Sequence, residues 1–166
     1  MTTQENLLSA FAGESQANRK YLAFAIKAEK EGFPQVAKLF RAIAEAETIH
    51  AFAHLKAMDG VGSTLENLRA AIEGEAYEFT VMYPGFLGMA EHEGNKRAIQ
   101  TMRSAMEVEK VHHHLYGKAM VAVTAEQDLP EGDFYLCPVC GHVEMGQAPD
   151  QCPICNLKKD KFIKMS

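Results

Sequence analysis

Apolar residues recur at three- and four-residue intervals through most of the first 124 residues, which are rich in Ala, Glu, Leu, Met and Lys. This spacing is typical of amphipathic helices. Gly and Pro residues interrupt the pattern near 32–34, 59–63 and 94, and such interruptions separate helices. The pattern therefore predicts helices near residues 3–31, 34–58, 64–93 and 95–124, and a mainly α fold.

Local signals mark the ends of these expected helices. Pro34 suits the first turn of the second helix, and Ser63 or Thr64 can cap the third, with Glu66 in its opening turn. Pro84 lies inside the third helix and predicts a kink there.

The helical part contains an internal repeat, because "AGESQA…EAETIHA" in the first half matches "EGEAYE…EVEKVHH" in the second. Glu14 matches Glu75 at an offset of 61, and His50 matches His112 at an offset of 62, so one extra residue falls between the two pairs. Two related helix hairpins imply an approximate two-fold axis, across which matching residues can converge on one point.

Polar residues interrupt the apolar stripe of each expected helix near its middle. Glu47 and His50 share one helix face with Phe40 and Ile43, and each stripe carries one Glu. Four unpaired buried carboxylates would cost several kcal/mol each, so cations must balance them. Oxygen-rich sites with one imidazole per ion suit iron or manganese, and this ligand pattern is that of ferritin-like di-iron bundles. The expected ligands are Glu14, Glu47, His50, Glu75, Glu109 and His112.

A simpler interpretation of a single Glu-x-x-His step is a solvated ion pair on a helix surface. The second copy, the apolar stripes and the matched Glu partners all argue against it here. Glu78 allows two interpretations, since it follows Glu75 by three residues and Ala17 occupies its place in the first repeat. It is either an exposed helical Glu or a seventh ligand that comes and goes with the oxidation state of one iron. His54, His92, His113 and His114 have no comparable support and are expected at the surface or behind the ligands.

The cysteines form a separate unit after a polar segment, "AEQDLPEGD", that has no apolar period. We therefore expect a helical domain over 1–124, a linker over 125–133 and a metal-binding domain of short strands and loops over 134–166. The spacing C-x2-C-x11-C-x2-C suits four thiolates around one metal, and its members are Cys137, Cys140, Cys152 and Cys155. Spacing alone does not separate iron from zinc and favours a structural zinc site.

Composition restricts the class of protein and its partners. The 166 residues are 47% hydrophobic and carry a net charge of −5, which fits a globular chain and argues against nucleic acid or an anionic membrane as partner. The start "MTTQENLLSAFAGES" has no basic region before an apolar one, and no apolar run reaches the ~20 residues of a spanning helix. These features predict a soluble, cytoplasmic protein.

The segments "FAGESQANRKY", "EAETIH", "EGEAYEFTVMYP" and "EVEKVH", followed by "CPVCG" and "CPIC", resemble the rubrerythrin family over essentially the whole chain. The resemblance implies a ferritin-like di-iron bundle joined to a rubredoxin-like Fe(Cys)4 domain, with iron rather than zinc in the thiolate site. It also implies reduction of hydrogen peroxide to water, with electrons from rubredoxin or an NAD(P)H-dependent reductase passing through the Fe(Cys)4 centre.

The same resemblance assigns roles to individual residues. His50 and Glu78 are expected to exchange as ligands of one iron between oxidation states, while His112 stays bound. Tyr21 in "ANRKY" and Tyr83 in "MYP" are expected to hydrogen-bond to ligand carboxylates. One departure is Asn156, where rubredoxin-type turns usually have Gly after the cysteine; Asn tolerates a left-handed backbone, so we expect the turn to persist.

Connection length predicts how the bundle assembles. If a two-fold axis relates the repeats, the second and third helices run parallel, and their connection must cover roughly 35 Å. "DGVGS", residues 59–63, spans at most about 20 Å. We therefore expect helix pairs exchanged between subunits of a homodimer or larger homo-oligomer.

Two other functions fit parts of the sequence. A ferritin-type protein that oxidises or stores iron would use the same six ligands, but it needs neither Glu78 nor the cysteine unit. A zinc-ribbon interaction protein would use the bundle as a docking surface, which has no need for buried carboxylates.

Overall fold

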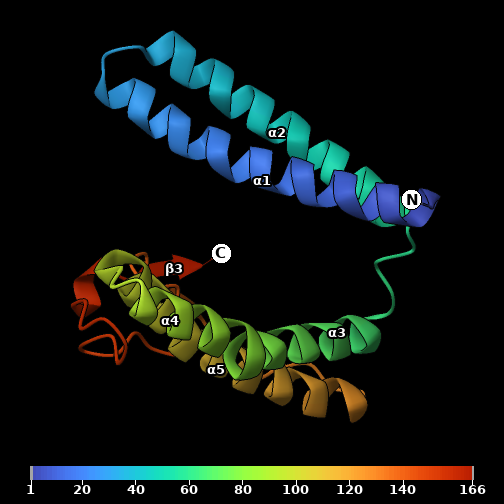
Figure 1. The fold of residues 1–166 in the computed structure, drawn as a ribbon. Coiled ribbons are helices and arrows are strands. Elements are labelled where there is room, and N and C mark those ends of the chain that lie inside the picture. The colour runs from blue at the N-terminus through green and yellow to red at the C-terminus, as the bar shows by residue number, and fades with distance from the viewer. Residues whose placement is uncertain (1, 166) are drawn as a thin grey trace. The chain divides into compact units, whose positions relative to one another are not determined.

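The computed structural model describes residues 2–165, and the chain divides after Gly62 into two compact units (Figure 1). The first unit is a hairpin of α1 (Thr3–Lys30) and α2 (Pro34–Ala57). The second contains α3 (Thr64–Tyr77), the π-helix η1 (Glu78–Met82), α4 (Tyr83–His92), α5 (Lys96–Thr124) and the cysteine-containing segment. The boundary lies in the connection between α2 and α3.

The helices begin where the sequence signals predict. Thr2 caps α1 and Ser63 caps α3, each in a capping box with the Glu three residues later, so both ends satisfy backbone N–H groups that have no partner within the helix. Pro34 lies in the first turn of α2. These predicted starts are confirmed, and the predicted helix ends agree within about two residues.

Both hairpins repeat the same internal contacts, which supports the duplication inferred from the sequence. Arg41 on α2 pairs with Glu29 on α1, and Arg103 on α5 pairs with Glu91 on α4 at 3.0 Å. The turns between these helices also match, because Gly32 and Gly94 have φ values of 83° and 67°, a region that glycine enters without strain. In both hairpins, a glycine with positive φ therefore ends the helix that precedes the turn.

Small residues fill the contact between α1 and α2, while large apolar side chains remain outside it. Ala25 and Ala37 are fully buried there with Ala28, and Phe40 packs against them. By contrast, Phe24 and Val36 keep 48% and 45% of their surface exposed. A two-helix hairpin with this much exposed apolar surface is typical of one half of a larger core.

The region predicted as one helix over 64–93 is interrupted by η1. The offset between the repeats changes from 61 at Glu75 to 62 at Glu91, and η1 lies between those positions. A π-helical segment accommodates one inserted residue within a helix. Pro84 then lies in the first turn of α4, so the interruption expected at Pro84 takes the form of a π-helix just before it.

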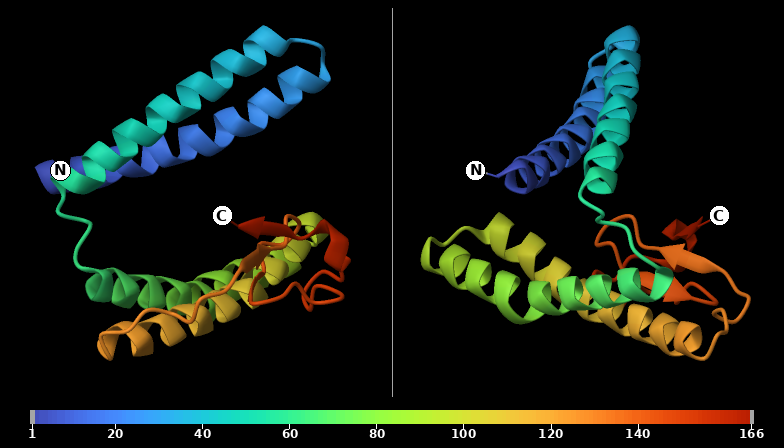
Figure 2. Two further views of the ribbon diagram at one scale, coloured as in Figure 1. Left: turned by 180° about the vertical axis from the view of Figure 1, so that it is seen from behind. Right: turned by 90° about the vertical axis from the view of Figure 1, so that its right-hand side faces the viewer.

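The last segment, orange to red in Figure 2, contains a small antiparallel sheet. Its strand order is β2-β1-β3. Its strands are β1 (Phe134–Leu136), β2 (Val143–Met145) and β3 (Ile163–Met165), with the short 3-10 helix η2 (Lys159–Lys161) before β3. Tyr135 pairs with Glu144 on one side and with Lys164 on the other. Two turns that carry the cysteines extend from this sheet.

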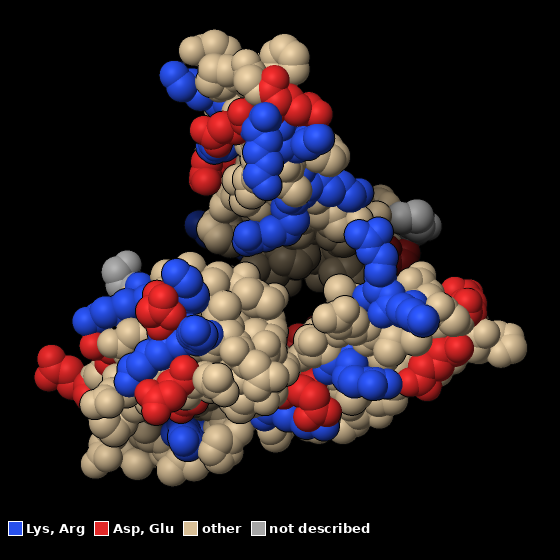
Figure 3. Space-filling model, turned by 90° about the vertical axis from the view of Figure 1, so that its left-hand side faces the viewer, with Lys and Arg blue, Asp and Glu red and all other residues tan. Residues whose placement is uncertain are grey.

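Charged side chains of both signs are interspersed on the face shown in Figure 3. Local ion pairs form among the charged residues of the chain, as Lys164 does with Asp133 at 2.8 Å. Within residues 2–165, no helix has both the length and the apolar character needed to cross a membrane.

Candidate metal centres

The α1–α2 hairpin brings three of the predicted ligands together. His50 Nδ1 lies 2.9 Å from Glu47 Oε2 on the same helix and 3.8 Å from Glu14 Oε1 on the neighbouring helix. Ligand atoms of these three residues all lie within 4.8 Å of one another. Glu47 and His50 are one helical turn apart, which explains why both face α1.

The second unit repeats this cluster with its own three ligands. His112 Nδ1 lies 2.8 Å from Glu109 Oε2 on α5 and 3.7 Å from Glu75 Oε2 on α3. The six predicted ligands therefore form two matching half-sites, one in each unit. The half-sites differ in burial, because the His50 side chain is 56% exposed and that of His112 is 24% exposed.

The chemistry of the second half-site fits a bound cation. Glu75 Oε2 is buried and has no hydrogen-bond partner among the described residues. Burial, the hydrogen bond with Glu109 and the negative charge of Glu109 together raise the pKa of Glu75 to about 7, although the nearby His112 opposes this shift. Two carboxyl groups pressed together this way favour a shared proton or a metal ion between them.

Glu78 in η1 and Tyr83 at the start of α4 are within electrostatic reach of the same half-site. The pKa of Glu78 is raised by burial and by the charge of Glu109, although His112 lowers it. Burial also raises the pKa of Tyr83, as do the charges of Glu109, Glu78 and Glu75. Glu78 thus lies within electrostatic reach of the ligands, while the three residues that cluster most closely are Glu75, Glu109 and His112.

Tyr21 lies in an aromatic cluster of the first unit. Its ring centroid is 6.2 Å from those of Phe24 and Phe40. The nearby buried polar residue is Asn18, whose Nδ2 donates to Ala44 O at 2.7 Å and to Thr48 Oγ1 at 2.8 Å. The hydrogen bond expected from Tyr21 to a ligand carboxylate stays a prediction.

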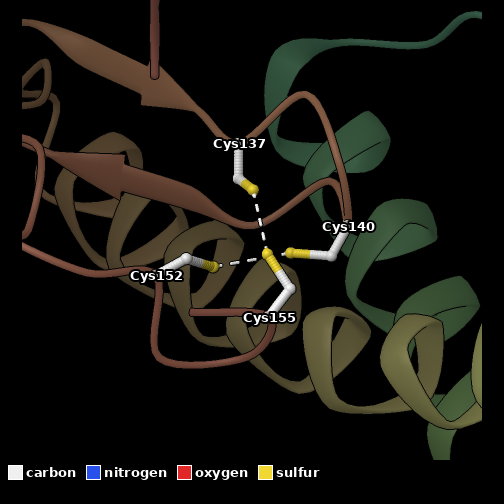
Figure 4. A group of neighbouring side chains, drawn as sticks. All are labelled: Cys137, Cys140, Cys152 and Cys155. Carbon is white, nitrogen blue, oxygen red and sulfur yellow. Dashed lines mark hydrogen bonds between the residues drawn. The ribbon is translucent and has the colours of Figure 1, made fainter. Parts of the chain in front are cut away.

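The four cysteines converge on one point from two turns, with the sulfur atoms directed toward one another (Figure 4). Sγ–Sγ distances of 3.5 Å join Cys137 to Cys155 and Cys140 to Cys152. Burial opposes ionisation of Cys137, but the backbone N–H groups of Cys140 and Val139 lower its pKa to about 7. Burial raises the pKa of Cys140. Ionisation of one thiol at the centre opposes ionisation of the other three, because thiolates repel one another. A bound metal ion removes this repulsion.

The two cysteine turns have the same backbone structure. Cys137 N donates to His142 O at 2.8 Å, and Cys152 N donates to Leu157 O at 2.8 Å. Gly141 has a φ of 88° and Asn156 a φ of 61°. The predicted left-handed Asn156 is confirmed, and it keeps the second turn in the shape of the first.

A contact that the sequence did not reveal joins the thiolate site to the second half-site. His112 Nε2 donates to Gly141 O at 3.1 Å, so the ring that faces the carboxylates with Nδ1 touches the first cysteine turn with Nε2. Val108, one turn earlier on α5, packs beside Gly141 and is 2% exposed. No local pattern predicts this contact, because 29 residues separate its partners.

Metal binding to the second half-site is expected to weaken as the pH falls below 7. The raised pKa means that the metal-free protein holds a proton on Glu75 up to about pH 7, and that proton must leave before the oxygen binds a metal. The apparent Mn²⁺ affinity should fall by up to about tenfold per pH unit below that value. Calorimetric titration in buffers with different ionisation enthalpies measures the affinity and the released proton; binding without proton release would contradict this protonation state.

The helical hairpins, the two Glu/Glu/His half-sites and the four-cysteine site define a ferritin-like di-iron protein with an appended rubredoxin-like domain. Two family models match the chain: rubrerythrin over residues 5–120, and the rubrerythrin rubredoxin-like domain over residues 135–163. The chain belongs to the rubrerythrin family. Glu14, Glu47, His50, Glu75, Glu109 and His112 fit the di-iron site of that family, and the four cysteines fit its single iron.

Similar proteins agree with this assignment over nearly the whole chain. Rubrerythrin-2 of Clostridium acetobutylicum is 37% identical, and the match covers 96% of this chain and 95% of that protein. Nigerythrin of Nitratidesulfovibrio vulgaris is 38% identical over 97% of this chain and 85% of its own length. A solved structure of partially reduced nigerythrin has a TM-score of 0.60 at 35% identity and covers 99% of this chain and 87% of the nigerythrin chain.

Proposed function

We propose that the protein reduces hydrogen peroxide to water, with electrons that enter through the thiolate site. Membership of the rubrerythrin family supports a di-iron oxidoreductase. The observation that carries the finer proposal is the hydrogen bond between His112 and Gly141, which links a ligand of the second half-site to the first cysteine turn. A protein that only stores iron has no use for such a connection.

Bound iron would supply the two electrons that cleave the O–O bond, and the side chains around it would supply protons and hold the ligand geometry. The reaction consumes one peroxide, two protons and two electrons and yields two waters. Burial and the charge of Glu109 raise the pKa of Glu78, which favours the protonated form of this carboxyl. The raised pKa of Tyr83 keeps its hydroxyl protonated, so that it can donate a hydrogen bond into the site.

The four thiols would hold the iron that receives electrons one at a time from rubredoxin or an NAD(P)H-dependent reductase. Cys137 and Cys152 are fully buried, while Cys140 and Cys155 are partly exposed. The second cysteine of each turn therefore gives an external donor its shortest approach to the site. We propose that the exchange of His50 and Glu78 as ligands accompanies the change in oxidation state. The less buried His50, with its side chain 56% exposed against 24% for His112, is the imidazole less tightly held by its own unit.

Steady-state kinetics with the two oxidants test this function. The protein loaded with about three irons per chain should show the red Fe(Cys)4 chromophore and consume reductant faster with hydrogen peroxide than with dioxygen. Faster consumption of dioxygen together with release of ferric ion would favour the ferroxidase alternative. A colourless protein that binds zinc alone would favour the interaction-protein alternative.

We further propose that each di-iron bundle contains one hairpin from each of two subunits. α2 has 24 residues and is about 36 Å long, and ferritin-like bundles need one long connection of this length. Only residues 58–63 separate α2 from α3. Gly60 N still bonds to Leu55 O at the end of α2, so the remaining chain to Thr64 extends about 14 Å. One chain is therefore too short to close its own bundle.

Exposure of the predicted core stripe supports the same assembly. Val36 and Ile43, which share a face with the ligands of α2, are 45% and 38% exposed, and Leu39 beside them is 59% exposed. A second copy that covers this face with its α3–α5 unit would bury the apolar stripe and bring two half-sites together. The result is a homodimer with two complete di-iron sites.

A further inference from the structure

The two cysteine turns have matching backbones, but the residue at one position is polar and buried in the first turn and apolar and half-buried in the second. The residue two places after the second cysteine is Leu157 in one turn and His142 in the other. Each accepts a hydrogen bond from the first cysteine through its carbonyl, at 2.8 Å in both turns, and each donates its backbone N–H to the second cysteine. An apolar side chain therefore suffices for the backbone structure of the turn.

His142 nevertheless carries a buried polar interaction. The residue is 2% exposed, and its Nε2 donates to Glu144 Oε2 at 3.1 Å. Its ring stands edge-on to Phe162 at a centroid distance of 6.5 Å, and Nδ1 is buried with no hydrogen-bond partner among the described residues. A buried pair of this kind contributes little net stability compared with an apolar side chain, so packing alone does not explain it.

The peptide between Gly141 and His142 is the unit that touches both metal sites. Its N–H, from His142, donates to Cys140 Sγ. Its C=O, from Gly141, accepts from His112 Nε2 at 3.1 Å. A rotation of this one peptide would weaken both hydrogen bonds, and Gly141 allows rotation because it has no side chain and a φ of 88°.

We propose that His142, held by Glu144, is a positioning residue that fixes this peptide between the thiolate site and His112. The carbonyl of His142 accepts a hydrogen bond from Cys137, and its ring contacts Glu144 and Phe162. Because both the backbone and the side chain of His142 are held, the direction of its N–H group is fixed as well. The role rests on the proposed function, in which one electron at a time leaves the thiolate site and reaches the carboxylate site with no bond made or broken. The external reductant, such as dithionite or a reduced redox protein, supplies that electron.

Two variants and one control test this role. Glu144→Ala removes the anchor from a partly exposed position, and His142→Leu gives the first turn the side chain of the second. Asp150→Ala is the matched control, since Asp150 lies in the same domain with its side chain 98% exposed. In the zinc-loaded protein, the amide of residue 142 is expected to exchange hydrogen about tenfold faster in Glu144→Ala, while the amide of Leu157 is unchanged and serves as the internal reference.

The iron-loaded protein provides the second measurement. After reduction with dithionite, mixing with peroxide should restore the Fe(Cys)4 absorbance about tenfold more slowly or slower still in both variants, and at the wild-type rate in Asp150→Ala. Unchanged amide exchange in Glu144→Ala, or an unchanged rate in both variants, overturns the positioning role. If peroxide fails to reoxidise the wild-type protein, the proposed function is wrong, and the exchange of the two amides still decides whether His142 positions the peptide.

Discussion

Glu78→Ala is expected to bind iron at the di-iron site and yet reduce peroxide about 10- to 100-fold more slowly. Glu75, Glu109 and His112 form the close cluster of the second half-site, and Glu78 is outside it, so its loss leaves the closest ligands in place. Glu78 is within electrostatic reach of Glu109 and His112, and burial with the charge of Glu109 raises its pKa. In the proposed function, the variant lacks the carboxyl that donates a proton and exchanges with His50 as a ligand. Iron content and peroxide-dependent NADH oxidation in a reconstituted system measure the two effects.

The control for this variant is Glu73→Ala, which removes an exposed carboxylate from α3, the helix that precedes η1. It changes the net charge and the helix propensity by the same amount as Glu78→Ala. It should retain wild-type turnover because no ligand lies near its side chain in helical register. Wild-type NADH oxidation by Glu78→Ala would show that Glu78 is an ordinary helical Glu.

The elements that could be predicted from the sequence are those set by local chemistry. Thr2 and Ser63 each precede a Glu by three residues and form capping boxes, and Pro34 fits only the first turn of a helix. The left-handed Asn156 is also local, because the turn geometry and the tolerance of Asn for positive φ are properties of a few neighbouring residues. Such features depend little on the rest of the fold.

The metal ligands could be predicted because the sequence contains them twice. A single Glu-x-x-His step has many uses, but Glu47–His50 and Glu109–His112 recur with a matched Glu on the preceding helix, and the structure gives them equivalent distances. The change of offset from 61 to 62 was visible as well. It indicates one inserted residue, but whether a helix accommodates it as a turn, a kink or a π-helix depends on tertiary packing, so η1 could not be predicted.

The role of His142 lies beyond the reach of sequence patterns for a different reason. This role depends on which side of the cysteine domain faces α5. Contacts of Gly141 with Val108 and His112, which are distant in the sequence, fix that orientation. Periodicity and spacing describe residues within one element. They do not describe how two elements with separate cores dock, and functional connections between metal sites are made at such contacts.

Heterodimers of Glu47→Ala and Glu109→Ala chains are expected to recover about half of the wild-type activity, whereas each variant alone is inactive. If hairpins are exchanged, one site of the heterodimer combines both defects, and the other combines the intact first unit of one chain with the intact second unit of its partner. If each chain closed its own bundle, both sites would carry one defect and neither would be intact. Each substitution removes a ligand that lies within 2.9 Å of its His, so a half-site with either change loses its metal.

Co-expression with two different affinity tags and purification on both isolates the heterodimer, and peroxide turnover with iron content measures the recovered site. The control pairs Glu14→Ala with Glu47→Ala, which lie in the same unit, so every site of that heterodimer has a defective first half in either architecture. Recovery in the first pair and not in the second requires a shared site, because no other arrangement reconstitutes six intact ligands. If both heterodimers are inactive, exchange of hairpins is wrong and each bundle closes within one chain. The connection after Gly60 would then have to reach farther than the roughly 14 Å that it can extend.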